Sequence, residues 1–128
     1  MEQPKVTTCL AWINCLQRNR SPVDTLNKRN IEEIIVYGVA DLGELFINEA
    51  ITKNFEIIGI TDQKIKVGNY AYRGINVLPR NELGLPKYRD KCVVVTSMTS
   101  FEQIKQQLMK ENVNNVISLW ELLDEAIK

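Results

Sequence analysis

The chain has 128 residues, of which 45% are hydrophobic and 25% are charged. These values are typical of one soluble globular domain with a single core. Sixteen basic and sixteen acidic residues cancel, which argues against nucleic-acid binding, because a phosphate backbone is held by a basic face. No apolar run approaches the roughly 18 residues of a membrane span, and the amino end lacks the layout of a secretory signal.

The reactive residue types limit the chemistry that the chain can perform. Cys9, Cys15 and Cys92 have no metal-ligand spacing and are interpreted as reduced, buried thiols of a cytoplasmic protein. The sequence contains no histidine, which removes the commonest general base, the Ser-His-Asp and Cys-His arrangements and most zinc sites. We therefore assign no catalytic residue and no metal ligand.

Two helices are predicted at the amino end. Apolar residues recur at helical spacing over residues 6–19, in a stripe made by Val6, Cys9, Leu10, Ile13 and Leu16, with Trp12 beside it. A short second helix is capped by Ser21, has Pro22 at its first position and Asp24 in its first turn, and closes near Asn30. We treat residues 1–30 as a helical extension packed on the domain formed by residues 31–128.

From residue 32 onward, strands alternate with helices, which is typical of a parallel sheet with right-handed crossovers. The strands are "EIIVYG", "FEIIGITD", "KCVVVTS" and "NNVIS". Helices are expected over residues 42–54, from Phe101 behind a capping box of Thr99 and Glu102, and over the closing "LWELLDEAIK".

The stretch 63–86 holds too many glycines and prolines for a crossover helix, and its "YAYRGINVLP" favours one or two short strands. The predicted fold is a three-layer α/β domain with a mainly parallel five-stranded sheet in the order 3-2-1-4-5. Its expected core residues are Ile35, Val36, Leu45, Ile58, Val94, Val95 and Val116.

The turn after the first strand carries the main functional signal. Its residues are Gly38-Val39-Ala40-Asp41-Leu42-Gly43. A dinucleotide-binding turn uses one glycine for the bend, a second for close approach of the pyrophosphate and a third for helix packing. Here the outer glycines are present and Ala40 replaces the middle one, which narrows the approach of a phosphate. Asp62 ends the next strand, where an acid binds ribose hydroxyls.

The same turn also has a purely structural interpretation. Asp41 lies at the helix start, where its carboxylate caps free N–H groups or repels an anion, depending on its orientation. Ser97, Thr99 and Ser100 follow the third strand and either contact a phosphate or sugar or cap a helix. The cations near the expected crevice, Lys64, Lys66 and Arg73, either meet an anion or are solvated loop charges. No Walker motif and no Tyr-x-x-x-Lys pair are present.

With these residues in view, the chain resembles a known family. "IIVYGVADLGELFINEA", "FEIIGITDQ", "VGNYAYRGINVLP" and "VVVTSMTSFEQIKQQL" are similar to the Rossmann-like domain of bacterial surface-polysaccharide and sugar-nucleotide proteins. That domain opens nucleoside-diphosphate-sugar dehydratases and the acetyltransferases of amino-sugar nucleotides, and it also occurs in stand-alone form. Its motifs fall here on Asp41-Leu42-Gly43, Asp62 and the segment from Gly74 to Val77.

Three hypotheses for function follow. The first is a non-catalytic nucleotide or sugar-nucleotide binding module of polysaccharide synthesis, with NAD(P) or a UDP-sugar as candidate ligand. Its site would comprise Gly38, Val39, Ala40, Asp41, Leu42, Gly43, Asp62 and Ser97. The second is a protein-interaction module with a degenerate pocket that recruits or regulates a glycosyltransferase. The third is a small NAD-dependent sugar-modifying enzyme, which the missing histidine and Tyr/Lys pair disfavour.

Self-association is the last expectation from the sequence. The helix from Leu42 carries apolar residues on more than one face, including Leu45, Phe46, Ile47 and Ile51, whereas a helix covering a sheet needs a stripe of about 100°. The amino-terminal helix buries the excess, either within the chain or across a two-fold axis. Because the net charge of zero offers no repulsion, we predict a homodimer.

Overall fold

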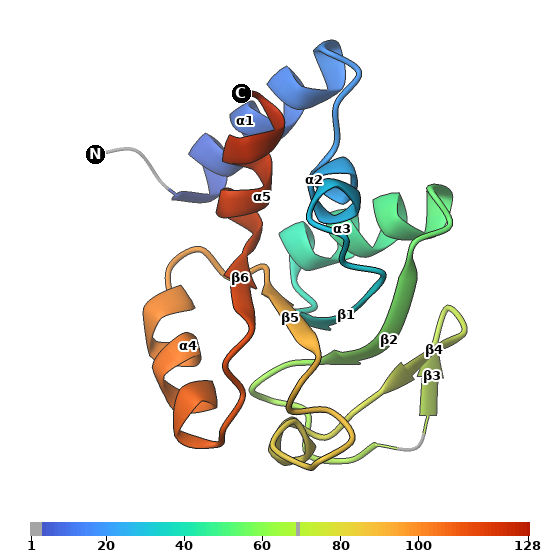
Figure 1. The fold of residues 1–128 in the computed structure, drawn as a ribbon, viewed down its shortest axis with the longest axis vertical. Coiled ribbons are helices and arrows are strands. Elements are labelled where there is room, and N and C mark those ends of the chain that lie inside the picture. The colour runs from blue at the N-terminus through green and yellow to red at the C-terminus, as the bar shows by residue number, and fades with distance from the viewer. Residues whose placement is uncertain (1–3, 69) are drawn as a thin grey trace.

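A six-stranded sheet runs through the centre of the computed structural model, which describes residues 4–68 and 70–128 and, for residues 4–6, the backbone alone (Figure 1). Its strands are β1 (Glu33–Tyr37), β2 (Glu56–Thr61), β3 (Tyr70–Tyr72), β4 (Ile75–Val77), β5 (Cys92–Val95) and β6 (Val116–Ser118). The helices are α1 (Pro4–Gln17), α2 (Pro22–Lys28), α3 (Asp41–Thr52), α4 (Phe101–Lys110) and α5 (Leu119–Ala126), with a 3₁₀ turn, η1, at Arg80–Glu82.

The strand order is β3-β4-β2-β1-β5-β6, and every pair is parallel except β3 with β4. The mixed α/β class and the mainly parallel sheet are confirmed. The predicted count of five strands is wrong, because residues 70–77 supply two strands joined by a tight turn. The two turn residues, Arg73 and Gly74, have φ of 54° and 82°, the pair of positive values typical of a type I′ hairpin turn.

Helices cover both faces of the sheet. One face packs against α1, α2, α3 and α5 through alternate strand residues such as Ile34 and Val36. The other face, with Ile35 and Tyr37, packs against α4 and the segment after β4. The central strands are therefore buried on both faces, which explains why they read as continuous apolar runs.

Two of the predicted core residues are not fully buried. Leu45 is 52% exposed, because successive helical residues are about 100° apart and the sheet-facing arc of α3 is occupied by Leu42, Phe46 and Ala50. Ile58 is only partly buried, since β2 lies on the far side of β1 from the strands that α4 covers.

One of the two predicted helix caps is confirmed and the other is wrong. Ser21 accepts a hydrogen bond from the N–H of Val23 and caps α2, as predicted. The capping box of Thr99 and Glu102 is wrong, because α4 starts at Phe101 after Ser100, and no side-chain cap bond is formed. The side chain of Val6, in the predicted stripe of α1, lies outside the described residues.

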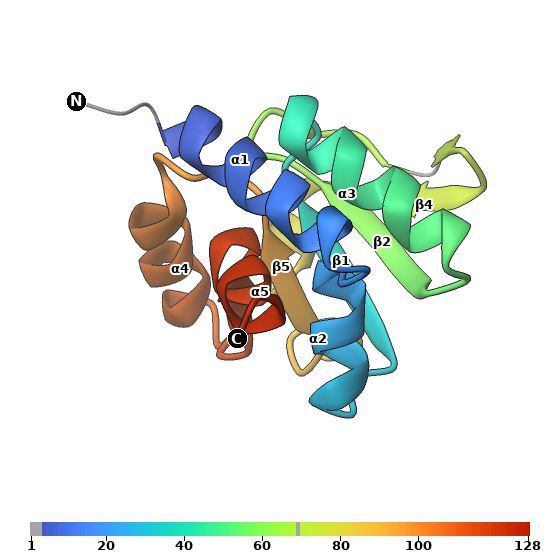
Figure 2. The same ribbon diagram turned by 90° about the horizontal axis from the view of Figure 1, so that it is seen from above.

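Hydrogen bonds join α2 and the segment between α1 and α2 to the last helix. Thr25 Oγ1 donates to the carbonyl of Leu122 at 2.9 Å, and Arg20 donates to the carbonyl of Ala126 at 3.2 Å. On the surface, Arg29 forms ion pairs with Glu121 and Glu125. Figure 2 shows α1 lying beside α3 and across α5. None of the helices in the described part of the chain is long and apolar enough to cross a bilayer.

Because Cys92 is buried, we expect the protein to lose stability at alkaline pH. The desolvation of its thiol raises its pKa from 9.0 to about 11. Between these values the unfolded thiol loses its proton while the folded one keeps it, so the free energy of unfolding falls as pH rises. We expect a loss of about 2 kcal/mol from this group, measured by urea unfolding between pH 8.5 and 10.5. Cys92→Ala should flatten this slope, and an unchanged slope would contradict the assignment.

Candidate nucleotide site

The turn between β1 and α3 is built around Gly38. Its φ of +116° lies in the region that favours glycine, and its N–H donates to the carbonyl of Thr61 at 2.9 Å. The hydroxyl oxygen of Thr96 lies 3.2 Å from the carbonyl oxygens of both Tyr37 and Gly38. A Cβ at Gly38 would stand 2.3 Å from that hydroxyl oxygen, so the neighbouring strand leaves no room for a side chain here.

Gly43 lets the first turn of α3 rest against the end of β1. A Cβ at this position would stand 2.0 Å from the carbonyl oxygen of Gly38. The close helix packing that the third glycine of the motif is expected to provide is thus present. Ala40 is the exposed N-cap residue of α3 and makes no side-chain cap bond.

Asp62 lies beside the turn, and its carboxylate holds two backbone groups. Oδ2 accepts from the N–H of Val39 and Oδ1 from the N–H of Lys64, both at 3.2 Å. The acid predicted to meet a sugar hydroxyl therefore also ties the end of β2 to the turn. It uses one N–H of the turn that a phosphate would otherwise meet.

The structure brings most of the predicted site residues to one edge of the sheet. The backbone nitrogen of Ser97, after β5, lies 3.7 Å from the Cβ position of Gly38. Val39, Ala40 and Asp41 are exposed there. Leu42 differs, because its side chain is buried in the core and only its backbone can face a ligand.

The surroundings of the turn are acidic. Asp41 and Glu44 both lie in the first turn of α3, and Asp62 is hydrogen-bonded to the turn itself. Carboxylates oppose a phosphate but accept hydrogen bonds from hydroxyl and amine donors. The described residues contain no group of three acid or cysteine ligands suited to a metal ion.

A pocket of about 250 Å³ opens next to the turn; we call it the hairpin pocket. Val39 and Glu44 form its wall on the turn and α3, and Tyr70 and Tyr72 form its wall on the β3–β4 hairpin. The phenol of Tyr72 donates to Glu44 at 3.0 Å, and Arg73 donates to the side chain of Asn48 at 3.1 Å. These two bonds hold the hairpin against α3. Sequence reasoning missed both tyrosines, although their alternation in "YAY" indicates that they share one face.

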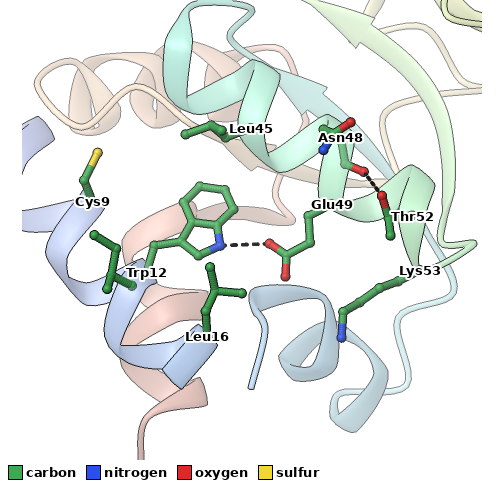
Figure 3. A pocket seen from close by; sticks show the side chains of 9 residues that line it. Cys9, Trp12, Leu16, Leu45, Asn48, Glu49, Thr52 and Lys53 are labelled. Carbon is green, nitrogen blue, oxygen red and sulfur yellow. Dashed lines mark hydrogen bonds between the residues drawn. The ribbon is translucent and has the colours of Figure 1, made fainter. Parts of the chain in front are cut away.

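A larger groove, of about 550 Å³, lies on another side of α3, between that helix and α1 (Figure 3). Its lining is mainly apolar and includes Trp12, Leu16 and Leu45. The indole N–H of Trp12 donates to Glu49 Oε2 at 2.8 Å, which joins the two helices across the groove floor. Glu49 Oε1 is buried and has no hydrogen-bond partner within the described residues. We call this hollow the α1–α3 groove.

Comparison with known protein families matches a family model to most of the chain. The family model described as "C2185-like, N-terminal" matches residues 30–117, which is more than half of the 128 residues. The matched segment contains the glycine turn, Asp62, the hairpin pocket and Ser97. No curated protein matches the chain.

Proposed function

The chain belongs to the C2185-like, N-terminal family. Because the family description states no ligand or reaction, we propose a function from the geometry of the site: the chain binds a nucleotide or sugar nucleotide without catalysing a reaction. The observation that carries this proposal is the hairpin pocket, which is lined by Tyr70 and Tyr72 of the hairpin and by Val39 of the glycine turn. The turn lies at the carboxyl ends of the parallel strands β1 and β2. Ligands of α/β sheets bind at that edge, where consecutive crossovers leave in opposite directions. Here β2 and β5 flank β1 on opposite sides.

The proposed fold assignment follows from the same strands. The parallel strands β4-β2-β1-β5-β6 correspond to a Rossmann-like core, with β3 added in antiparallel orientation at the edge. We propose a role for the chain in bacterial polysaccharide synthesis, because its glycine turn, Asp62 and the "YRGINV" segment resemble those of the sugar-nucleotide family.

Each part of a nucleotide has a matching part of the site. The base would lie in the hairpin pocket against Tyr70 and Tyr72, whose rings offer stacking surfaces. The sugar hydroxyls would donate to Asp62, whose carboxylate accepts more than two bonds. The phosphates would lie over Ala40, at the start of α3, where backbone N–H groups favour an anion. Gly38 and Gly43 shape the turn beneath them, and Ser97 borders it.

We expect one member of a panel of NAD⁺, NADH, a UDP-sugar and coenzyme A to stabilise the protein in thermal unfolding. At 100 times its dissociation constant, the bound ligand adds about 2.7 kcal/mol. Tyr72→Ala should weaken binding at least tenfold, and Tyr72→Phe, which keeps the ring, should weaken it less. Trp120→Ala, a partly exposed aromatic site on α5, is the control and should bind like the wild type.

Substitutions of Ala40 test the placement of the phosphate. Ala40→Gly should strengthen binding, and Ala40→Asp should abolish it. An aspartate is a good N-cap residue, so the loss of binding by Ala40→Asp would not come from loss of the helix. Unchanged affinity in Ala40→Asp would place the ligand elsewhere, and no stabilisation by any ligand would contradict the proposal.

A second candidate function is an interaction module with a degenerate pocket, which recruits or regulates a glycosyltransferase. The hydrogen bond from the N–H of Val39 to Asp62 favours this alternative, because that N–H is then not free to bind a phosphate. The carboxylates of Asp41 and Glu44 also favour it, because they repel an anionic ligand. A panel without any response, together with saturable binding to a glycosyltransferase, would support this alternative. A small NAD-dependent enzyme stays a prediction to which we assign no catalytic residue.

A further inference from the structure

The outer face of α1 is apolar and exposed. Leu10, Ile13 and Leu16 are 60%, 51% and 56% exposed, and their spacing of three places them on one ridge of the helix. The opposite face of α1 is buried through Trp12 and Cys15. A helix that covers a domain normally shows charged residues to solvent, but "TTCLAWINCLQ", residues 7–17, contains none.

This ridge borders the α1–α3 groove and shares residues with it. Ile13 and Leu16 belong both to the ridge and to the groove lining, and Leu45 forms the opposite wall on α3 while being 52% exposed itself. Figure 3 shows Leu16 and Leu45 projecting toward the groove from the two helices. A protruding apolar ridge thus lies directly beside an apolar hollow.

We propose that a second copy of this chain fills the groove, with the two α1 helices antiparallel about a two-fold axis near Ile13. Each ridge then lies in the groove of the other protomer, in the way that helix ridges pack into grooves. A two-fold interface must be self-complementary, and a ridge beside a matching groove on one face meets that condition. A small molecule in the groove would leave Leu10 exposed, whereas a second copy covers both features.

Charge also favours a second copy. The central ridge is uncharged, as the core of an interface typically is. Of the two ionic groups that line the groove, Lys53 lies 3.7 Å from Asp24, and Glu49 accepts from Trp12 through Oε2 at 2.8 Å, while Glu49 Oε1 has no partner within the described residues. Polar side chains of α3, Asn48 and Thr52, line the groove as well and supply the polar part of the interface. The two ridges, which carry no charged residue, therefore meet without repulsion.

Sedimentation of the full chain from 1 to 100 μM tests the proposal. We expect a species of twice the 14.7 kDa chain mass, which Ile13→Glu converts to a monomer with unchanged circular dichroism. Met109→Glu is the matched control, because Met109 is 50% exposed on α4, which covers the opposite sheet face; it should stay dimeric. A wild-type monomer at 100 μM overturns the proposal, and so does a dimer that survives Ile13→Glu.

A cross-linking experiment locates the axis. In a Cys9→Ser background, Ile13→Cys places two thiols close together across the two-fold axis and should give a disulfide-linked dimer under mild oxidation. Met109→Cys in the same background should remain monomeric on a non-reducing gel. Equal cross-linking of both variants would contradict the proposed axis, because it would indicate random collision.

Discussion

Gly43→Ala is expected to lower the free energy of unfolding by about 3 kcal/mol, although alanine is the better helix former by roughly 1 kcal/mol. The reason is steric, since the added Cβ would meet the carbonyl oxygen of Gly38 at 2.0 Å. That oxygen belongs to the backbone at the end of a central strand and cannot turn aside. The first turn of α3 must move outward, which loosens the packing of Leu42 and Phe46 in the core. Urea unfolding followed by circular dichroism measures the loss.

Gly74→Ala is the matched control for this effect. Gly74 has a positive φ of 82°, but no atom lies within 4 Å of its Cβ position, so only backbone strain of about 1–2 kcal/mol is added. If Gly43→Ala were instead more stable than the wild type, α3 would not rest against Gly38 in the way described. Weaker nucleotide binding by Gly43→Ala would be a separate result, because the turn itself moves.

Arg80→Met is expected to destabilise the protein by about 3 kcal/mol, the lower end of the range for breaking a buried ion pair. The guanidinium donates twice to Glu111, at 3.1 and 2.8 Å, and its Nε donates to the phenol oxygen of Tyr37 at 2.9 Å. The side chain of Arg80 is only 11% exposed, while that of Glu111 is 31% exposed. In Arg80→Met, water therefore solvates part of the unpaired Glu111 carboxylate and reduces the loss of stability. Urea unfolding at pH 7 gives the value.

Arg29→Met provides the comparison at the surface. Arg29 pairs with two carboxylate groups, those of Glu121 and Glu125, and these side chains are 52% and 45% exposed. Exposed pairs contribute about 0–1 kcal/mol each, so we expect Arg29→Met to lose less stability than Arg80→Met, although it breaks two ion pairs. Glu111→Leu combined with Arg80→Met should recover part of the stability, because no unpaired carboxylate then remains. Equal losses at Arg80 and Arg29 would show that burial does not govern the difference.

The helix ends show where sequence reasoning reached its limit. Residues 19, 30 and 54 were predicted as the last of their helices, but α1, α2 and α3 each end two residues earlier. In all three cases the later residue is an asparagine with positive φ, which is the left-handed conformation that closes a helix. The helical period in the sequence is right, and the stop signal was taken for part of the helix. Asn112 closes α4 in the same way.

The sequence predicts mainly those site residues that lie close together along the chain. The glycine turn and Asp62 come from one strand-turn-helix-strand unit, and their spacing places them together. The tyrosines of the hairpin pocket could not be placed, because the path of residues 63–77 decides where the hairpin lies against α3. That path is fixed by contacts between distant residues, such as Tyr72 with Glu44 and Arg73 with Asn48. Leu45 is exposed for a different reason, because Leu42, Phe46 and Ala50 occupy the arc of α3 that faces the sheet.

The hydrogen bonds between the amino-terminal segment and α5 set an order for folding during synthesis. Thr25 needs the carbonyl of Leu122, and Arg20 needs that of Ala126. The first residue of α5 lies 91 positions after the last residue of α2 (119 − 28), a length that a ribosome adds in roughly 5–18 s at about 5–20 residues per second. For that time Val23 and Leu26, both buried in the final core, have no partner on α5. In the nascent chain, α1 and α2 are therefore the segment open to chaperones, and to the matching helices of a neighbouring chain on the same message.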